Sequence, residues 1–268
     1  MINFYGPGSP LTADGVAAVL NPTNLGQAEL WSVLSVETSG CGFMTDRRPK
    51  ILFERHIFSR LTGHKFDADD SDISQPSAGG YGPSGAHQYD RLNAAMQLDA
   101  EAALQSASWG LGQIMGENFH DAGYPSVDAM VADMVASEDC HLQAMLKFIA
   151  AQDLLGPLTQ HNWGSFACCY NGPNYVANNY DGQLGHFYSL YCARATPDLR
   201  VRTAQIYLTY LGYAIGAIDG LAGPATQAAV TAFQAKTAVA QTAVIDDTLI
   251  AALLAAVKNT LGSGSGAQ

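Results

Sequence analysis

The sequence changes character near Ala195–Asp198, and this change most constrains the fold. Residues 1–195 contain 20 Asp and Glu side chains against 9 Lys and Arg, whereas residues 196–268 contain 4 acidic and 4 basic side chains. The second part also has shorter helical patterns and more tight turns. Such an asymmetry indicates two modules. We therefore expect a first domain over residues 1–195, a second over 198–262 and a flexible tail over 263–268.

The overall composition is that of a globular protein. Hydrophobic residues make up 48% of the chain and charged residues 14%. No apolar run reaches about 18 residues, so we expect no membrane insertion. The net charge of −11 repels phosphate backbones, which makes nucleic acid an unexpected partner. The N-terminal residues lack the basic and apolar regions of a secretory signal, so we expect synthesis in the cytoplasm.

The cysteines and histidines predict neither a disulfide framework nor a metal site. The five cysteines are an odd number without a CxxC pair. Cys168 and Cys169 fall in an apolar helical run, where we expect buried free thiols. The histidines form no HExxH motif, and His120 and His161 are expected to be surface or core residues. We expect no metal and no cofactor.

Apolar periodicity predicts a mainly α fold. The helical patterns cover residues 12–20, 25–37, 91–107, 126–152 and 161–171. Residues 49–61 fit either a helix or a short strand that leads into one. Residues 62–90 are rich in Gly, Ser, Pro and Asp, which predicts a long loop of the functional or mobile kind.

Glu37 is the first candidate for chemistry, because it follows an apolar run and precedes Thr38-Ser39-Gly40. At a helix end, the negative pole of the helix dipole disfavours an ionised carboxyl group. Apolar neighbours one turn back disfavour it further by desolvation. Both effects raise the pKa, as a general acid requires. The alternative is a solvated charge at the end of a helix.

Glu54 is the second candidate, and it lies within the apolar run ILFERHIF. A glutamate in such a run either pairs with the neighbouring Arg55 or faces a cleft. His56 follows in the same segment. On the pattern alone it fits a surface or satisfied core residue.

Two further segments have the composition of a sugar-binding surface. In SWGLGQIMG, the Trp109 ring suits the apolar face of a sugar and the Gln113 amide suits its hydroxyl groups. The alternative is a packed turn. In CCYNGPNY, a helix that ends at Gly-Pro would leave Tyr170 and Asn171 at its rim. The alternative there is ordinary helix capping.

Taken in order, these segments resemble the N-acetylmuramidase family of phage endolysins over residues 12 to about 192. The resemblance is carried by ETSGCGF, RPKILFERHIFSRLTG, GGYG, ASWGLGQIMG, YNGPNY and NNYDGQL. The order is also distantly similar to that of goose-type lysozymes and lytic transglycosylases. The segment VRTAQIYLTYLGYAIGAIDGLAGPATQAAVTAFQ is similar to the small three-helix peptidoglycan-binding domain. The resemblance implies an α+β lysozyme-like catalytic domain followed by that module.

The resemblance also implies a muramidase that cleaves the β-1,4 bond between N-acetylmuramic acid and N-acetylglucosamine. Glu37 would be the general acid and Glu54 the second carboxylate. The other matching positions are candidate substrate-binding residues, namely His56, Tyr81, Trp109, Gln113, Tyr170 and Asn171. The chain departs from the family in one place, where Glu37-Thr38-Ser39-Gly40-Cys41 stands for the usual Glu-Ser-Gly-Gly.

Two rival functions stay open at this stage, a lytic transglycosylase and an inactive cell-wall-binding protein. The expected partner is the glycan strand of bacterial peptidoglycan, and we expect a monomer. The enzyme would reach the cell wall after release by a holin or a secretion machine. A tethered second module would raise the local concentration of the first on the wall.

Overall fold

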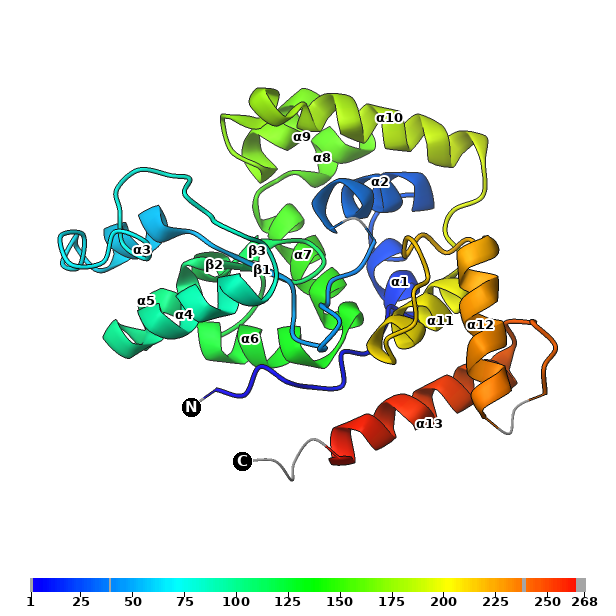
Figure 1. Ribbon diagram of the computed structural model, residues 1–268. Coiled ribbons are helices and arrows are strands. Elements are labelled where there is room, and N and C mark those ends of the chain that lie inside the picture. The colour runs from blue at the N-terminus through cyan, green and yellow to red at the C-terminus, as the bar shows by residue number, and fades with distance from the viewer. Residues whose placement is uncertain (1, 39, 238–239, 264–268) are drawn as a thin grey trace.

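The computed structural model describes residues 2–38, 40–237 and 240–263 and confirms the mainly helical fold (Figure 1). Within these residues, no helix is both long and apolar enough to cross a membrane. The elements of the first module are α1 (Ala13–Leu20), α2 (Gln27–Thr38), β1 (Ile51–Phe53), α3 (Arg55–Leu61), α4 (Ala86–Leu98), α5 (Ala100–Gln105), β2 (Ala107–Trp109), β3 (Ile114–Met115), η1 (Gly116–Asn118), α6 (Val127–Ala136), α7 (Glu138–Ala151), α8 (Leu155–Thr159), α9 (Trp163–Tyr170), η2 (Tyr175–Asn178) and α10 (Tyr180–Ala193). Those of the second are α11 (Leu199–Tyr210), α12 (Pro224–Lys236) and α13 (Asp247–Ser263).

The three short strands form one antiparallel sheet in the order β1-β2-β3. The register places Ile51 opposite Trp109 on one side and Ile114 opposite Trp109 on the other. The sequence of residues 49–61 fitted either a helix or a short strand that leads into one. The protein has the second arrangement, with strand β1 followed by helix α3. The register thereby places the start of β1 beside the turn between β2 and β3, and the end of β1 beside the start of β2.

Two of the predicted helices are each divided by a capping residue. The 126–152 pattern divides at Ser137, whose backbone is extended and whose Oγ accepts a hydrogen bond from the Cys140 N–H. The 91–107 pattern divides at Asp99, whose side chain caps α5, and its last residue already belongs to β2. Short polar side chains bond to the first free amides of a helix, and so each begins a new one. The expectation of continuous helices is wrong at both points.

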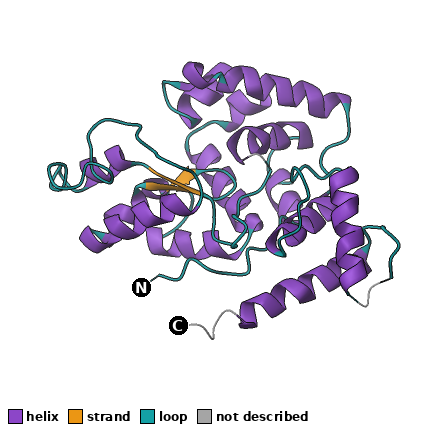
Figure 2. Ribbon diagram, viewed as in Figure 1, coloured by secondary structure: helices purple, strands orange, loops and turns teal. Residues whose placement is uncertain are grey.

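Helix α10 has no counterpart among the predicted helices. It packs along α2 and covers one side of it together with α9 (Figure 1). Leu184 is the one fully buried residue of α10. A helix with so few buried positions has little apolar periodicity in its sequence, which is why the sequence did not predict it. A hydrogen bond of 2.8 Å between the hydroxyl groups of Tyr191 and Ser35 joins the two helices. The predicted 62–90 loop is irregular until α4 begins at Ala86 (Figure 2).

The expectation that Cys168 and Cys169 are buried is wrong, since both are free and exposed. They lie on helix α9, as the pattern predicted. However, α9 buries only Phe166 and Ala167 against the core. The two cysteines follow on the opposite face of the helix.

The second module consists of α11, α12 and α13. The buried Gln205 joins its parts, since its Oε1 accepts a hydrogen bond of 2.9 Å from the Gly220 N–H and its Nε2 donates one of 3.1 Å to the Thr226 hydroxyl. Helix α12 begins with Pro224, which suits the first helical position because its missing N–H would have no partner there. Helix α13 reaches Ser263, the first residue of the predicted tail, and residues 264–268 lie outside the described ones.

The core consists of two clusters of buried apolar side chains. The larger one belongs to the first module. The smaller one contains Val230 and Phe233 of the second module, and it also includes Cys41 and Phe43 of the first. The loop that follows α2 therefore packs into the core of the second module. We call this contact between the modules the seam.

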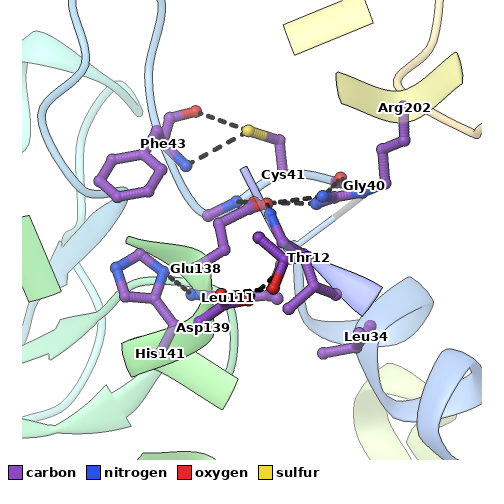
Figure 3. A network of polar contacts seen from close by, with 12 residues as sticks. Thr12, Leu34, Gly40, Cys41, Phe43, Leu111, Glu138, Asp139, His141 and Arg202 are labelled. Carbon is purple, nitrogen blue, oxygen red and sulfur yellow. Dashed lines mark hydrogen bonds and ion pairs between the residues drawn. The ribbon is translucent and has the colours of Figure 1, made fainter. Parts of the chain in front are cut away.

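A buried ion pair crosses the seam (Figure 3). The side chains of Arg202 and Glu138 are 1% and 0% exposed, and Nη2 of the arginine donates to Oε1 of the glutamate at 2.8 Å. Arg202 also donates to the Gly40 carbonyl, and Glu138 accepts from the N–H groups of Gly42 and Leu11 at 2.8 Å each. Burial raises the pKa of Glu138, but the charge of Arg202 and the hydrogen bonds from Arg202 and the Gly42 N–H together outweigh this effect and lower the pKa below its ordinary value. The pair is therefore charged near neutral pH.

We expect Glu138→Gln to lower the free energy of unfolding by about 3–5 kcal/mol, because it leaves the Arg202 charge buried and unpaired. Chemical denaturation at pH 7 measures the change. Glu101→Gln is the matched control, since Glu101 is exposed and accepts a hydrogen bond from Gln105 of its own helix; we expect a change within about 0.5 kcal/mol. Equal stability of the two variants would contradict a structural role for the pair.

Candidate active site

Glu37 lies in the last turn of α2, as the sequence predicted, and is partly buried. Its Oε1 accepts a hydrogen bond of 2.8 Å from Nδ2 of Asn171. Burial raises the pKa of Glu37 to about 7, although the Asn171 hydrogen bond acts in the opposite direction. Desolvation disfavours the charged form of a carboxyl group. The alternative of a solvated charge at a helix end is therefore excluded.

Glu54 lies between the end of β1 and the start of α3. Its Oε2 is 3.1 Å from Nδ1 of His56. Burial raises the pKa of Glu54, and the neighbouring His56 and Tyr81 side chains oppose this effect by favouring the ionised form. The suggested pair with Arg55 is wrong, because the Arg55 guanidinium donates to the Ser71 carbonyl.

Gln113 lies in the turn between β2 and β3 with a left-handed backbone, at φ +49°. Its Nε2 donates to the Gly110 carbonyl at 2.8 Å, and its Oε1 accepts from the Ser108 hydroxyl at 2.9 Å. Left-handed backbone is uncommon for residues other than glycine and occurs often at functional sites. The amide of Gln113 thus holds its own turn in shape, and one of its N–H groups also approaches the Lys50 carbonyl at 3.3 Å.

Trp109 does not reach the site, and the expectation that its ring stacks on a sugar is not met. The ring is 0% exposed and packs against Phe4, with 5.9 Å between ring centroids. Its Nε1 donates to the Leu104 carbonyl at 3.1 Å. The alternative of a packed turn applies to this residue, since a buried indole needs the hydrogen-bond partner that Leu104 supplies.

Tyr170 and Asn171 lie at the end of α9, where the sequence placed them. The Tyr170 hydroxyl donates to the Gly112 carbonyl at 2.7 Å, which ties α9 to the β2–β3 turn. Asn171 caps α9 through its backbone N–H and also hydrogen-bonds to Glu37, so the expected capping is confirmed and its role in substrate binding stays a prediction. Its Oδ1 is buried, and among the described residues it has no hydrogen-bond partner.

The structure brings all the candidate residues except Trp109 into one cleft of about 620 Å³. The cleft is lined by Glu37, Glu54, His56, Tyr81, Gln113, Tyr170 and Asn171, among others. Glu37 and Gln113 also line an adjoining hollow of about 430 Å³ on the side of Lys50. Glu37 therefore lies between two hollows, as a group that acts on the middle of a bound polymer would.

Sequence reasoning missed several polar residues of this site, among them Tyr180 and Lys50. Tyr180, at the start of α10, lines the cleft. Lys50 lines the adjoining hollow, and its Nζ donates to the Thr38 carbonyl at 3.0 Å. Both belong to the segments that carry the family resemblance, but their neighbours in the chain gave no local signal for a role.

The remaining cavities and clusters offer no competing centre. Over residues 2–38, 40–237 and 240–263, no group of three or more His, Cys, Asp and Glu side chains is arranged to hold a metal ion. A cavity of about 270 Å³ at the seam is lined largely by apolar side chains, and Asp219 is the only carboxylate among its lining residues. Paired carboxylates thus occur in the cleft and not at the seam cavity.

Comparison with known proteins gives two family matches. Residues 26–192 match the sequence model of the N-acetylmuramidase family, and residues 198–253 match that of a peptidoglycan binding domain. The crystal structure of the Burkholderia AP3 phage endolysin is similar at 36% identity, with a TM-score of 0.62 over 68% of this chain and 71% of that one. No curated protein sequence matches. These findings confirm the predicted fold class, a lysozyme-like domain followed by a helical peptidoglycan-binding domain, and this chain belongs to the N-acetylmuramidase family.

Proposed function

We propose that this protein is a peptidoglycan hydrolase that cleaves the β-1,4 bond between N-acetylmuramic acid and N-acetylglucosamine. The observation that carries the proposal is the presence of two partly buried carboxyl groups, Glu37 and Glu54, in one cleft. The family match and the endolysin neighbour support the substrate class. The site of action would be the bacterial cell wall, reached after release by a holin or a secretion machine.

In this proposal Glu37 is the general acid. With a pKa of about 7, a large fraction of the carboxyl groups carries a proton at neutral pH. The glycosidic oxygen takes that proton as the bond to the sugar breaks. Asn171 holds Oε1 of Glu37 through its Nδ2. This contact leaves the other oxygen free to carry the proton toward the substrate.

Glu54 is the proposed second carboxylate, and its environment differs from that of Glu37. His56 and Tyr81 both favour its ionised form, whereas Asn171 is the sole hydrogen-bonding side chain that lowers the pKa of Glu37. Burial raises the pKa of both groups, and the partners that favour ionisation are more numerous at Glu54, so we assign Glu37 as the acid and Glu54 as the base. Glu54 would activate a water molecule on the opposite face of the sugar ring, which inverts the anomeric carbon.

The substrate would contact the polar groups that the protein leaves without partners. The buried Oδ1 of Asn171 is an acceptor suited to an acetamido N–H or a sugar hydroxyl group. Tyr180 and Tyr81 offer aromatic rings in the same cleft. The two hollows on either side of Glu37 suit a glycan strand that passes through the site, rather than a small molecule that ends there.

We expect Glu37→Gln to fold and to lose activity by about 10²–10⁴-fold, because the amide has no proton to donate to the leaving oxygen. The measurement is clearance of outer-membrane-permeabilised cells, followed by turnover of soluble glycan fragments. Glu101→Gln, an exposed glutamate outside the cleft, is the control and should match the wild type. Clearance by Glu37→Gln at the wild-type rate would refute the assignment of the acid.

Mass spectrometry of the digested wall separates the rival functions. Reducing muramic acid ends indicate a hydrolase, whereas 1,6-anhydro ends indicate a lytic transglycosylase. An absence of new ends, with binding to the wall retained, would show an inactive cell-wall-binding protein. We expect reducing ends.

We expect Glu54→Gln to lower kcat by about 10²–10⁴-fold, since a general base contributes about as much as a general acid. Proton NMR of the first products of the wild type reports the anomer released. An α-anomer from a β-linked strand supports Glu54 as the base of an inverting reaction. A β-anomer would instead make Glu54 a nucleophile or an electrostatic stabiliser.

The raised pKa of Glu37 also predicts how stability depends on pH. The ordinary pKa of 4.5 applies to the unfolded chain and about 7 to the folded one, so the folded state resists ionisation of this group. The resulting destabilisation is absent below about pH 4.5, grows between pH 4.5 and 7, and is complete above. We expect Glu37→Gln to be more stable than the wild type by about 1–2 kcal/mol at pH 8, with a smaller difference at pH 4. Denaturation curves at both pH values measure this, and a pH-independent difference would contradict the buried position of the acid.

A further inference from the structure

Arg202 is the side chain of the second module that hydrogen-bonds to the segment following the Glu37 helix. Its Nε and Nη2 donate to the Gly40 carbonyl at 3.0 and 2.6 Å, and the same guanidinium pairs with Glu138 (Figure 3). Arg202 belongs to α11 of the second module, whereas Gly40 and Glu138 belong to the first. A planar guanidinium presents its N–H donors in a fixed fork and here bonds both partners together, a geometry that the compact ammonium group of lysine does not reproduce.

The backbone after α2 is held at successive points by charged side chains. Lys50 donates to the Thr38 carbonyl at 3.0 Å, Arg202 bonds the Gly40 carbonyl, and Glu138 accepts the Gly42 N–H at 2.8 Å. Thr38 and Glu37 are adjacent in the last turn of α2. The position of this segment therefore sets where the end of the Glu37 helix lies.

Helix α7 connects the same network to the opposite wall of the cleft. His141, three residues after Glu138, accepts a hydrogen bond of 3.0 Å from the Leu111 N–H through its Nδ1. Burial lowers the pKa of His141, so the neutral ring also donates from Nε2 to the Met134 carbonyl. Leu111 lies in the turn that carries Gln113, and its neighbour Gly112 accepts the Tyr170 hydroxyl.

Gly40 allows the two modules to approach each other closely. Its φ of +103° lies in the region that favours glycine, and a Cβ atom there would overlap the Ile218 carbonyl of the second module. The Arg202 contact thus belongs to a packed seam in which no side chain separates the two backbones.

We propose that Arg202 is a positioning residue for the active site, so that the second module forms a structural part of the catalytic unit in addition to any role in binding the wall. It acts through Gly40 and Glu138 to fix the end of the Glu37 helix relative to the β2–β3 turn. This inference rests on the proposed function of Glu37 as the general acid.

Arg202→Lys tests the proposal in the full-length protein, because it keeps the charge that Glu138 requires but loses the fork of N–H donors that bonds Glu138 and the Gly40 carbonyl together. We expect kcat on soluble glycan fragments to fall about tenfold with an unchanged KM, since small displacements of a catalytic group lower rates steeply. A loosened segment admits water to Glu37, so the alkaline limb of the pH–rate profile should move to lower pH. The titratable side chains that line the hollows around Glu37, namely Glu54, His56, Lys50, Tyr81, Tyr170 and Tyr180, are unchanged in the variant.

Arg200→Lys is the matched control. Arg200 lies on the same helix and pairs with Asp247 at 3.0 Å, but its side chain is 51% exposed and that of Asp247 is 89% exposed. We expect wild-type kcat, KM and pH profile from it. The double variant Glu138→Gln/Arg202→Gln buries no charge and also leaves the Gly40 carbonyl without its guanidinium, so it provides a second test if the lysine variant folds poorly.

Hydrogen exchange of the backbone amides of residues 40–43 gives a readout that is independent of activity. We expect faster exchange in Arg202→Lys than in Arg200→Lys. The inference would be overturned if Arg202→Lys had the kcat, the pH–rate profile and the amide exchange of the wild type. It would also be overturned if the variant were less stable but kept the wild-type kcat and the wild-type alkaline limb of the pH–rate profile. If the wild type itself releases no glycan ends, the proposed function fails, and exchange still decides whether Arg202 fixes this segment.

Discussion

The ion pair between Arg202 and Glu138 is the interaction on which the arrangement of the two modules depends. Removal of two charges from water costs several kcal/mol for each ion, and the attraction between them offsets this only in a good geometry with further hydrogen bonds. Those bonds are present, since Glu138 accepts the N–H groups of Gly42 and Leu11 and Arg202 donates to the Gly40 carbonyl. Each module therefore contains a buried charge that only the other can neutralise.

The same constraint reaches the cleft because Glu138 and His141 lie one turn apart on α7. Residues three apart on a helix face the same side, so one helix face contacts both the segment after Glu37 and, through Leu111, the β2–β3 turn. The acid and the wall that faces it are thus aligned by a single rigid element. This alignment explains how a site assembled from segments far apart in the chain keeps its carboxyl groups in distinct surroundings.

The sequence allowed prediction of the parts that depend on local pattern. The apolar run and the glycine after it placed Glu37 at a helix end, as the structure confirms, and burial there raises its pKa in the expected direction. Trp109 could not be placed, because a Trp beside two glycines fits both a sugar platform and a core residue, and the partner that decides, Phe4, is 105 positions away in the sequence. The Arg202–Glu138 pair spans 64 positions and two modules, and no local pattern marks either residue.

Because the two modules pack against each other at the seam, the second module would contribute to cleavage of the wall in a different way from a module on a flexible tether. A flexible tether samples many separations, so that binding by one module raises the effective concentration of the other over a range of distances. The seam fixes one separation and one orientation, because Gly40 lies against Ile218 and Arg202 joins the two modules. In the proposed function, binding by the second module would then assist catalysis only on wall segments whose geometry fits both sites at once. An enzyme of this kind would select its cleavage points along a strand by the shape of the wall as well as by the chemistry of the bond.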